Sequence, residues 1–306
     1  MTVLKTKGIT KRFGKFQALD GIDMDVQLGE IYGFIGPNGA GKSTTIRILL
    51  GIIKATSGKA EIFGKDTWKK AVSIHQHIAY VPGDVNIWPN LTGGEVIDLF
   101  LKLRGDKNTA KREALIRRFD LDPTKKCRTY SKGNLQKVAL IAALASDADL
   151  FILDEPTSGL DPLMEHVFQE CVLELKEASK SILLSSHILS EVEQLCDRVG
   201  IIRRGKIIES GTLREMRHLT RSQIYVETKQ SITGLDSFQG VHNLTERDAG
   251  ISFQADSDAL DPLMQHISQF GVIKLESAPP TLEDLFMRHY QQQEQSTPAT
   301  GGITHG

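Results

Sequence analysis

The chain has 306 residues, of which 40% are hydrophobic and 25% are charged, a composition typical of globular proteins with at least one large core. Its formal net charge of −1 gives no general electrostatic attraction to nucleic acid or to anionic lipid, so we expect no nucleic-acid partner. The cysteines are scattered and lack CxxC spacing, which argues against a disulfide framework and a zinc site. They are Cys127, Cys171 and Cys196.

The sequence predicts neither a membrane-spanning segment nor a secretion signal. No apolar run approaches the roughly 20 residues that a membrane-spanning helix needs, and residues 138–145 form one of the longest such runs. The first residues lack the apolar core and the cleavage site of a secretion signal. We therefore expect a cytoplasmic protein.

Up to about Gly205, short β-branched or apolar runs alternate with helix-length segments, and glycine-containing turns separate them. This alternation is typical of an α/β architecture. Few strand signals occur in residues 84–148, where 94–104 and 109–119 carry helical patterning. We predict one α/β domain over residues 1–220, with a mainly helical subdomain inserted at about 84–148.

The pattern changes beyond residue 220. Three short runs of strand-forming residues lie at 224–226, 251–253 and 273–275, separated by segments that could include two helices. They predict a small α/β domain over residues 221–290. Residues 291–306 are rich in Gln, Thr and Gly and hold almost no core-forming residues, so we expect a disordered tail.

The strongest motif is GPNGAGKS at residues 36–43, which matches the phosphate-binding loop G-x-x-x-x-G-K-[ST] and follows the apolar run 31–35. Glycines let the backbone curl so that successive N–H groups point at phosphate oxygens, while Lys42 supplies positive charge and the Ser43 hydroxyl can bind magnesium. Apolar residues at helical spacing follow, so a helix N-terminus faces the nucleotide. A chance glycine-rich turn is the alternative. The expected nucleotide-binding residues are Gly36, Pro37, Asn38, Gly39, Ala40, Gly41, Lys42, Ser43 and Thr44.

A second motif is the buried-strand run 150–153, which ends in Asp154 and Glu155. Ligands bind at this carboxyl edge of parallel sheets. We expect Asp154 to hold Mg²⁺, directly or through water, and Glu155 to act as the general base on the attacking water. Taken alone, an Asp-Glu pair at a strand end is more often a solvated edge.

These motifs, together with YSKGN at 130–134, SGLD at 158–161 and His187, resemble the ordered motifs of ATP-binding-cassette (ABC) ATPases. The resemblance covers about residues 1–220. The YSKGN segment precedes the Asp-Glu strand by a single apolar helix, residues 135–145, as that family requires. The resemblance implies a phosphate-loop nucleotide-binding domain of the ABC type, with ATP and Mg²⁺ as cofactors.

The resemblance also implies a composite site. In the family, the signature loop of one subunit closes on the γ-phosphate held by the other, which implies Ser131 and the Gly133 backbone as ligands in an ATP-dependent head-to-tail homodimer. It implies His187 as a γ-phosphate contact that helps to position the water, and Phe13 as the ring that stacks on adenine, with Phe16 a weaker candidate. From the residues alone, the YSKGN segment is a helix-starting turn, and His187 and Phe13 are structural residues.

Three positions depart from the family pattern. Gly83 stands where the family usually has the glutamine that links magnesium to the permease contact, and Asp84 either substitutes as a metal-facing oxygen or caps the turn. Lys132 and Asn134 stand where the family more often has Gly and Gln, and Tyr130 replaces the usual leucine. Lys132 adds positive charge near the expected position of the phosphate.

The resemblance implies the ATP-hydrolysing subunit of an ABC transporter, peripheral on the inner face of the cell membrane through a separate permease chain. Family analogy favours an exporter. Similar C-terminal extensions are frequent in the branch with separate permeases, and residues 280–286 resemble their closing helix. The residues alone indicate an amphipathic helix packed on its own domain.

Two other functions fit a phosphate loop. A cassette ATPase without transport would act on ribosomes or DNA, but such proteins usually carry two cassettes or long coiled coils, and neither pattern occurs here. A phosphoryl-transfer kinase would need no signature segment and would have a pocket for a second substrate.

Overall fold

The computed structural model describes most of the chain, namely residues 1–105, 109–218, 221–247 and 249–278. Two compact units divide it, Met1–Gly211 and Thr212–Gly306. The domain bounds expected from the sequence stay a prediction. The expected closing helix at 280–286 and the expected disordered tail lie outside the described residues.

The first unit is built on a six-stranded sheet in the order β10-β9-β3-β8-β7-β6. Its strands are β3 (Ile31–Ile35), β6 (Ile78–Val81), β7 (Leu150–Asp154), β8 (Ser181–Ser186), β9 (Arg198–Arg203) and β10 (Lys206–Thr212). Neighbouring strands from β9 to β6 run parallel. Every residue of β3 and β7 is buried, which explains why both strands appear in the sequence as continuous apolar runs.

A smaller antiparallel sheet has the order β2-β1-β4-β5. Its strands are β1 (Thr2–Phe13), β2 (Phe16–Gln27), β4 (Ser57–Ile62) and β5 (Lys65–Asp66). Helix α1 (Lys42–Leu49) contributes Ile46 to a core that also holds Leu4 of this sheet and Phe34 of the larger one. The helix that follows the phosphate loop is therefore fixed in the main hydrophobic core.

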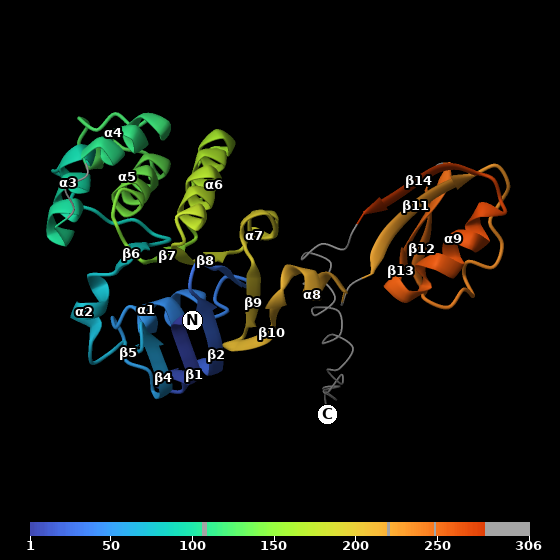
Figure 1. Cartoon of the computed structure of the whole chain (residues 1–306), viewed down its shortest axis with the longest axis horizontal. Helices are drawn as coiled ribbons and strands as arrows, with labels where there is room; N and C mark the ends of the chain where they lie inside the picture. The colour runs from blue at the N-terminus through green and yellow to red at the C-terminus, as the bar shows by residue number, and fades with distance from the viewer. Residues whose placement is uncertain (106–108, 219–220, 248, 279–306) are drawn as a thin grey trace, which may run out of the picture. The chain divides into compact units, whose positions relative to one another are not determined.

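Helices occupy the chain between β6 and β7, where α3, α4 and α5 gather together (Figure 1). Besides α1, the α-helices of this unit are α2 (Ala71–His75), α3 (Gly93–Arg104), α4 (Thr109–Arg118), α5 (Lys132–Leu144), α6 (Pro162–Glu177) and α7 (Leu189–Leu195). A capping box starts α3, since Thr92 Oγ1 accepts from Glu95 N and Glu95 Oε2 accepts from Thr92 N. The predicted α/β architecture with inserted helices is confirmed. Within the described ranges, no helix is both long and apolar enough to cross a bilayer.

The second unit is an antiparallel sheet in the order β12-β13-β11-β14. Its elements are α8 (Leu213–His218), β11 (Ser222–Thr228), β12 (Val241–Arg247), β13 (Gly250–Ala255), α9 (Leu260–Ser268) and β14 (Val272–Ala278). Phe253 and Leu263 join strand and helix in its own core. The prediction of three strands was incomplete, because β12 is an exposed edge strand of mostly polar residues and lacks an apolar face.

Candidate nucleotide-binding site

The loop of residues 36–44 joins β3 to the first turn of α1, and close contacts require glycine at two of its positions. A Cβ at Gly36 would collide with Ile202 O, and a Cβ at Gly41 would lie 2.6 Å from Leu19 Cδ2. Gly41 also has φ 117°, a conformation that side chains disfavour. The loop therefore lies tightly against neighbouring strands, and the unpaired N–H groups at the start of α1 offer a place for an anion.

The structure brings Lys42, Glu155 and His187 together. Lys42 is buried, and its Nζ donates to Gly36 O at 2.6 Å and Pro37 O at 3.4 Å. The same ammonium lies 3.1 Å from Glu155 Oε1, and Glu155 Oε2 lies 2.9 Å from His187 Nδ1. Glu155 thus bridges the lysine of the loop and the histidine that follows β8. This meeting follows from the strand order, because β3, β8 and β7 are adjacent and parallel.

The end of β7 is held by Ser185 of β8. Asp154 is buried and accepts a hydrogen bond from Ser185 Oγ, while Glu155 N donates to Ser185 O at 2.9 Å. Glu155 has φ 48°, a conformation that costs about 1–3 kcal/mol for a residue other than glycine. The sequence pattern does not single out Ser185, because it is one of three serines in β8.

The YSKGN segment at residues 130–134, which corresponds to the signature loop of the family, caps the N-terminus of α5. Ser131 Oγ accepts from Asn134 N at 3.3 Å. Gly133 lies against the turn that follows Glu155, where a Cβ at Gly133 would collide with Gly159 O. Within one copy, the first turn of α5 is thereby in contact with the turn that follows Glu155.

The aromatic candidates for base stacking face one another at the end of the β1–β2 hairpin. Phe13 is 50% exposed and Phe16 is 66% exposed. Lys11 Nζ lies 5.0 Å from the centroid of the Phe13 ring. Both rings are therefore open to a planar ligand, and Phe13 carries an adjacent positive charge.

Gly83 lies beside the end of β7. A Cβ at this position would be 3.1 Å from Asp154 O and 3.6 Å from Glu155 Cβ. Asp84 is exposed, and a metal-facing role for it remains a prediction. The position where the family usually has glutamine is therefore next to the Asp-Glu pair in this chain too, but it lacks a side chain.

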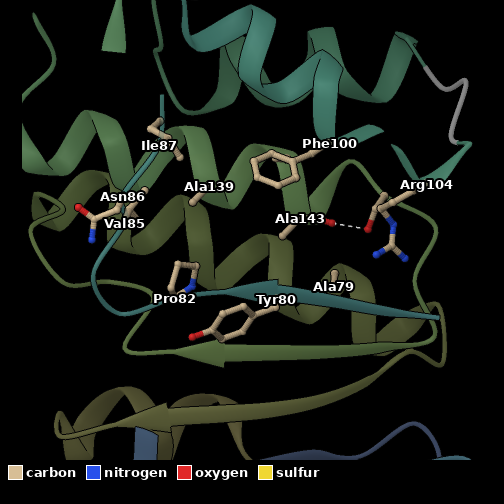
Figure 2. Close-up of a pocket in the computed structure, with 12 residues that line it drawn as sticks. Ala79, Tyr80, Pro82, Val85, Asn86, Ile87, Phe100, Arg104, Ala139 and Ala143 are labelled. Carbon is tan, nitrogen blue, oxygen red and sulfur yellow. Dashed lines mark hydrogen bonds between the residues drawn. The ribbon is translucent and has the colours of Figure 1, made fainter. Parts of the chain in front are cut away.

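An apolar pocket of about 210 Å³ lies between β6 and the helices α3 and α5. Figure 2 shows Tyr80 and Pro82 on its strand side, with Phe100 and Ala143 on its helix side. Burial, and then the charge of Asp154, raise the pKa of Tyr80 to about 12. This pocket was not predicted, because its lining comes from three segments that meet only in the folded chain.

Comparison with known families gives two matches that divide the chain. Residues 19–158 match the family model described as ABC transporter. Residues 211–290 match the model described as the C-terminal domain of DrrA1-3-like ATP-binding proteins. The second match ends at residue 290, beyond Ala278, which is the last residue that the structure describes.

Two relatives align with most of the chain. The bacitracin transport ATP-binding protein BcrA of Bacillus licheniformis is 34% identical, and the alignment covers 94% of this chain and 97% of BcrA. The daunorubicin/doxorubicin resistance ATP-binding protein DrrA of Streptomyces peucetius is 32% identical, with 83% of this chain and 78% of DrrA covered.

Solved structures agree with this assignment. The ATP-binding subunit of an ABC transporter superposes with a TM-score of 0.66 at 32% identity, covering 71% of this chain and 92% of that subunit. The cassette MJ0796, in a dimeric post-hydrolysis state with ADP and Pi, gives a TM-score of 0.62 at 26% identity, with 69% of this chain and 99% of that cassette covered. The chain therefore belongs to the ATP-binding subunits of ABC transporters and is an ABC transporter ATPase.

Proposed function

We propose that this subunit powers the export of small molecules through a permease formed by a separate chain, and that it is peripheral on the inner face of the membrane. The observation that carries the proposal is the alignment of nearly the whole chain, C-terminal domain included, with BcrA. The similarity to DrrA, whose name refers to drug resistance, also supports export.

In this proposal, the ATP phosphates bind the N–H groups of residues 39–44 and the ammonium of Lys42. The donors present suit Mg²⁺, because the hydroxyl of Ser43 and the carboxylate of Asp154 are hard oxygen ligands. The hydrogen bond from Ser185 Oγ holds Asp154 in place. A bound magnesium ion would supply charge neutralisation for the phosphates.

Glu155 is the proposed general base. Its Oε1 forms an ion pair with Lys42 Nζ at 3.1 Å. Phosphate oxygens compete for the same ammonium, so ATP would draw Lys42 away and leave Oε1 able to accept a proton from the attacking water. His187, at 2.9 Å from Oε2, would keep the carboxylate oriented and contact the γ-phosphate.

The proposal includes an ATP-dependent head-to-tail homodimer. Ser131 and the Gly133 backbone of one copy would contact the γ-phosphate held by the other. Two observations support it: Ser131 is exposed at a helix N-terminus, and the similar cassette MJ0796 is dimeric in its post-hydrolysis state.

The pocket beside β6 is the proposed permease contact. It is mostly apolar, as the core of a protein interface requires, and its strand side continues into Gly83, which lies next to Asp154. Pressure on this loop would reach the Asp-Glu pair through backbone contact. The usual glutamine side chain would not be needed for that step.

Copurification tests the proposal. A tagged chain, solubilised from membranes in mild detergent, should retain a polytopic membrane protein, and the pair should release phosphate from ATP faster when an exported compound is added. The variant Glu155→Gln should copurify equally well without turnover. Recovery of the chain with ribosomes or DNA, and never with a membrane protein, would support the alternative function and refute the transport assignment.

A further inference from the structure

Lys132 occupies a position that its own fold does not favour. It is the first residue of α5, whose first turn holds no acidic residue. A lysine there opposes the helix dipole, whose positive end is at the N-terminus. Its side chain is exposed, and in the part of the chain that the structure describes it makes no ion pair. Its contact is a neutral one, from Nζ to Ser158 Oγ at 3.1 Å.

The structure also fixes where this charge lies. The stem of Lys132 runs along Gly159, because a Cβ built on Gly159 would be 3.5 Å from Lys132 Cγ and 3.6 Å from Cδ. One turn further along α5, the buried side chain of Gln136 donates to Pro156 O at 3.0 Å. The turn at residues 156–159 is therefore fixed against the start of α5, and the stem of Lys132 lies on this turn, which reduces the side-chain freedom that binding an anion would cost.

An uncompensated positive charge at a fixed position favours an anion that arrives from outside the copy. We propose that Lys132 is a further ligand of the ATP γ-phosphate held by the second copy, and that it exchanges Ser158 Oγ for that phosphate when the dimer closes. This inference rests on the proposed head-to-tail homodimer. The exchange replaces a neutral acceptor with an anionic one, so the ammonium gains a Coulombic attraction that the serine hydroxyl does not offer.

The test uses the full chain in the Glu155→Gln background, in which ATP is not consumed. Dimerisation with ATP and Mg²⁺ is measured by sedimentation. Adding Lys132→Gln should weaken the ATP-dependent dimer by about tenfold or more, whereas Lys132→Arg should retain most of it. Binding of ATP to the single copy, measured at concentrations too low for dimers, should not change, since Lys132 acts on the partner's nucleotide.

Two controls separate this role from others. Lys126→Gln removes an exposed lysine shortly before the same loop, and it should leave the dimer unchanged if general electrostatic attraction is not the cause. Ser158→Ala removes the resting contact alone. If Ser158→Ala weakened the dimer as much as Lys132→Gln, Lys132 would be a structural residue and the proposal would be wrong.

The remaining outcomes are equally decisive. A Glu155→Gln chain that dimerises, together with a Lys132→Gln version that dimerises equally well, would overturn the role of Lys132 and leave the proposed function intact. A Glu155→Gln chain that stays monomeric with ATP would overturn the homodimer, and this inference with it.

Discussion

Glu155 is paired on both carboxylate oxygens, and this pairing leads to a specific expectation for its amide variant. We predict that Glu155→Gln lowers turnover by about 10²- to 10⁴-fold, because an amide cannot accept the proton of the attacking water. ATP affinity should be equal to that of the parent or tighter, since glutamine no longer holds Lys42 in an ion pair. Phosphate release and equilibrium ATP binding, measured on the same preparation, separate the two effects.

Glu177→Gln is a matched control, because Glu177 is exposed at the end of α6, and it should change neither quantity. Retention of more than about a tenth of parental turnover in Glu155→Gln would lie outside the range for a general base. The base assignment would then be withdrawn, and Asp84 and His187 would be the next residues to test.

The loop motif at 36–43 was enough to propose Lys42, and the end of the apolar run 150–153 was enough to propose Asp154 and Glu155, whereas His187 was implied only by the family resemblance. Their mutual contacts could not be proposed in the same way. The Lys42–Glu155 ion pair depends on the order β3-β8-β7, which follows from how the connections cross the sheet. The left-handed backbone of Glu155 is fixed by tertiary contacts and has no signal in residue type.

At the scale of elements, the first turn of α5 and the turn at residues 156–159 form one unit. We predict that Gly133→Ala lowers hydrolysis by about 10²-fold, because the added methyl group forces the two turns apart and a displacement of about 1 Å can cost that much. ATP binding to the single copy should be retained, since Lys42 and the phosphate loop are not displaced. Turnover and ATP affinity are the measurements, with circular dichroism as the check of folding. Loss of ATP binding in a folded variant would contradict this separation.

Asp256 connects the edge strand β12 with the start of β11, because His242 and Arg221 both contact its carboxylate. Hydrogen bonds from His242 at 3.0 Å and from Arg221 at 2.8 Å lower the pKa of Asp256. Because the folded pKa lies below the unfolded one, the stabilisation is present at neutral pH and is lost as the pH falls through the folded value. Asp256→Asn should therefore loosen β12 at pH 7, while the difference from the parent should shrink near pH 3.

Hydrogen exchange of residues 241–255, corrected for intrinsic rates, measures this effect at both pH values. Asp258→Asn is the control, since Asp258 is an exposed neighbour. Equal protection of the Asp256→Asn variant and its parent at pH 7 would show that β12 is held by its backbone pairing alone.

The elements themselves were predictable where burial is one-sided or complete. The helices α3 and α4 have apolar residues at helical spacing, and β3 and β7 are continuous apolar runs, so their residues indicate their structure directly. β12 has neither property, because most of its side chains face solvent. The antiparallel sheet of β1, β2, β4 and β5 was not separated from the parallel one, since strand partners are chosen by tertiary packing.

At the scale of the whole molecule, no residue of the proposed nucleotide site belongs to the second unit. Each residue proposed to bind ATP, from Phe13 to His187, lies within Met1–Gly211. The second unit has its own core around Phe253 and Leu263, and it carries no phosphate-binding motif. Because the proposed ATP-binding residues all lie in the first unit, ATP binding should survive removal of the second unit, provided that the first unit keeps its own core.

We therefore predict that a chain ending at residue 220 binds ATP with an affinity within about threefold of the parent, a change of less than 1 kcal/mol. Phosphate release should still depend on Glu155, whereas we expect copurification with the permease or dimerisation to change if the second unit adds surface to either contact. Equilibrium ATP binding and circular dichroism, measured on the shortened and full-length chains, provide the comparison. The same truncation in the Lys42→Ala background serves as the control for specific binding, since it removes the charge that compensates the phosphates. If the shortened chain is folded and yet fails to bind ATP, residues beyond 220 complete the site, and the proposed division between the two units is wrong.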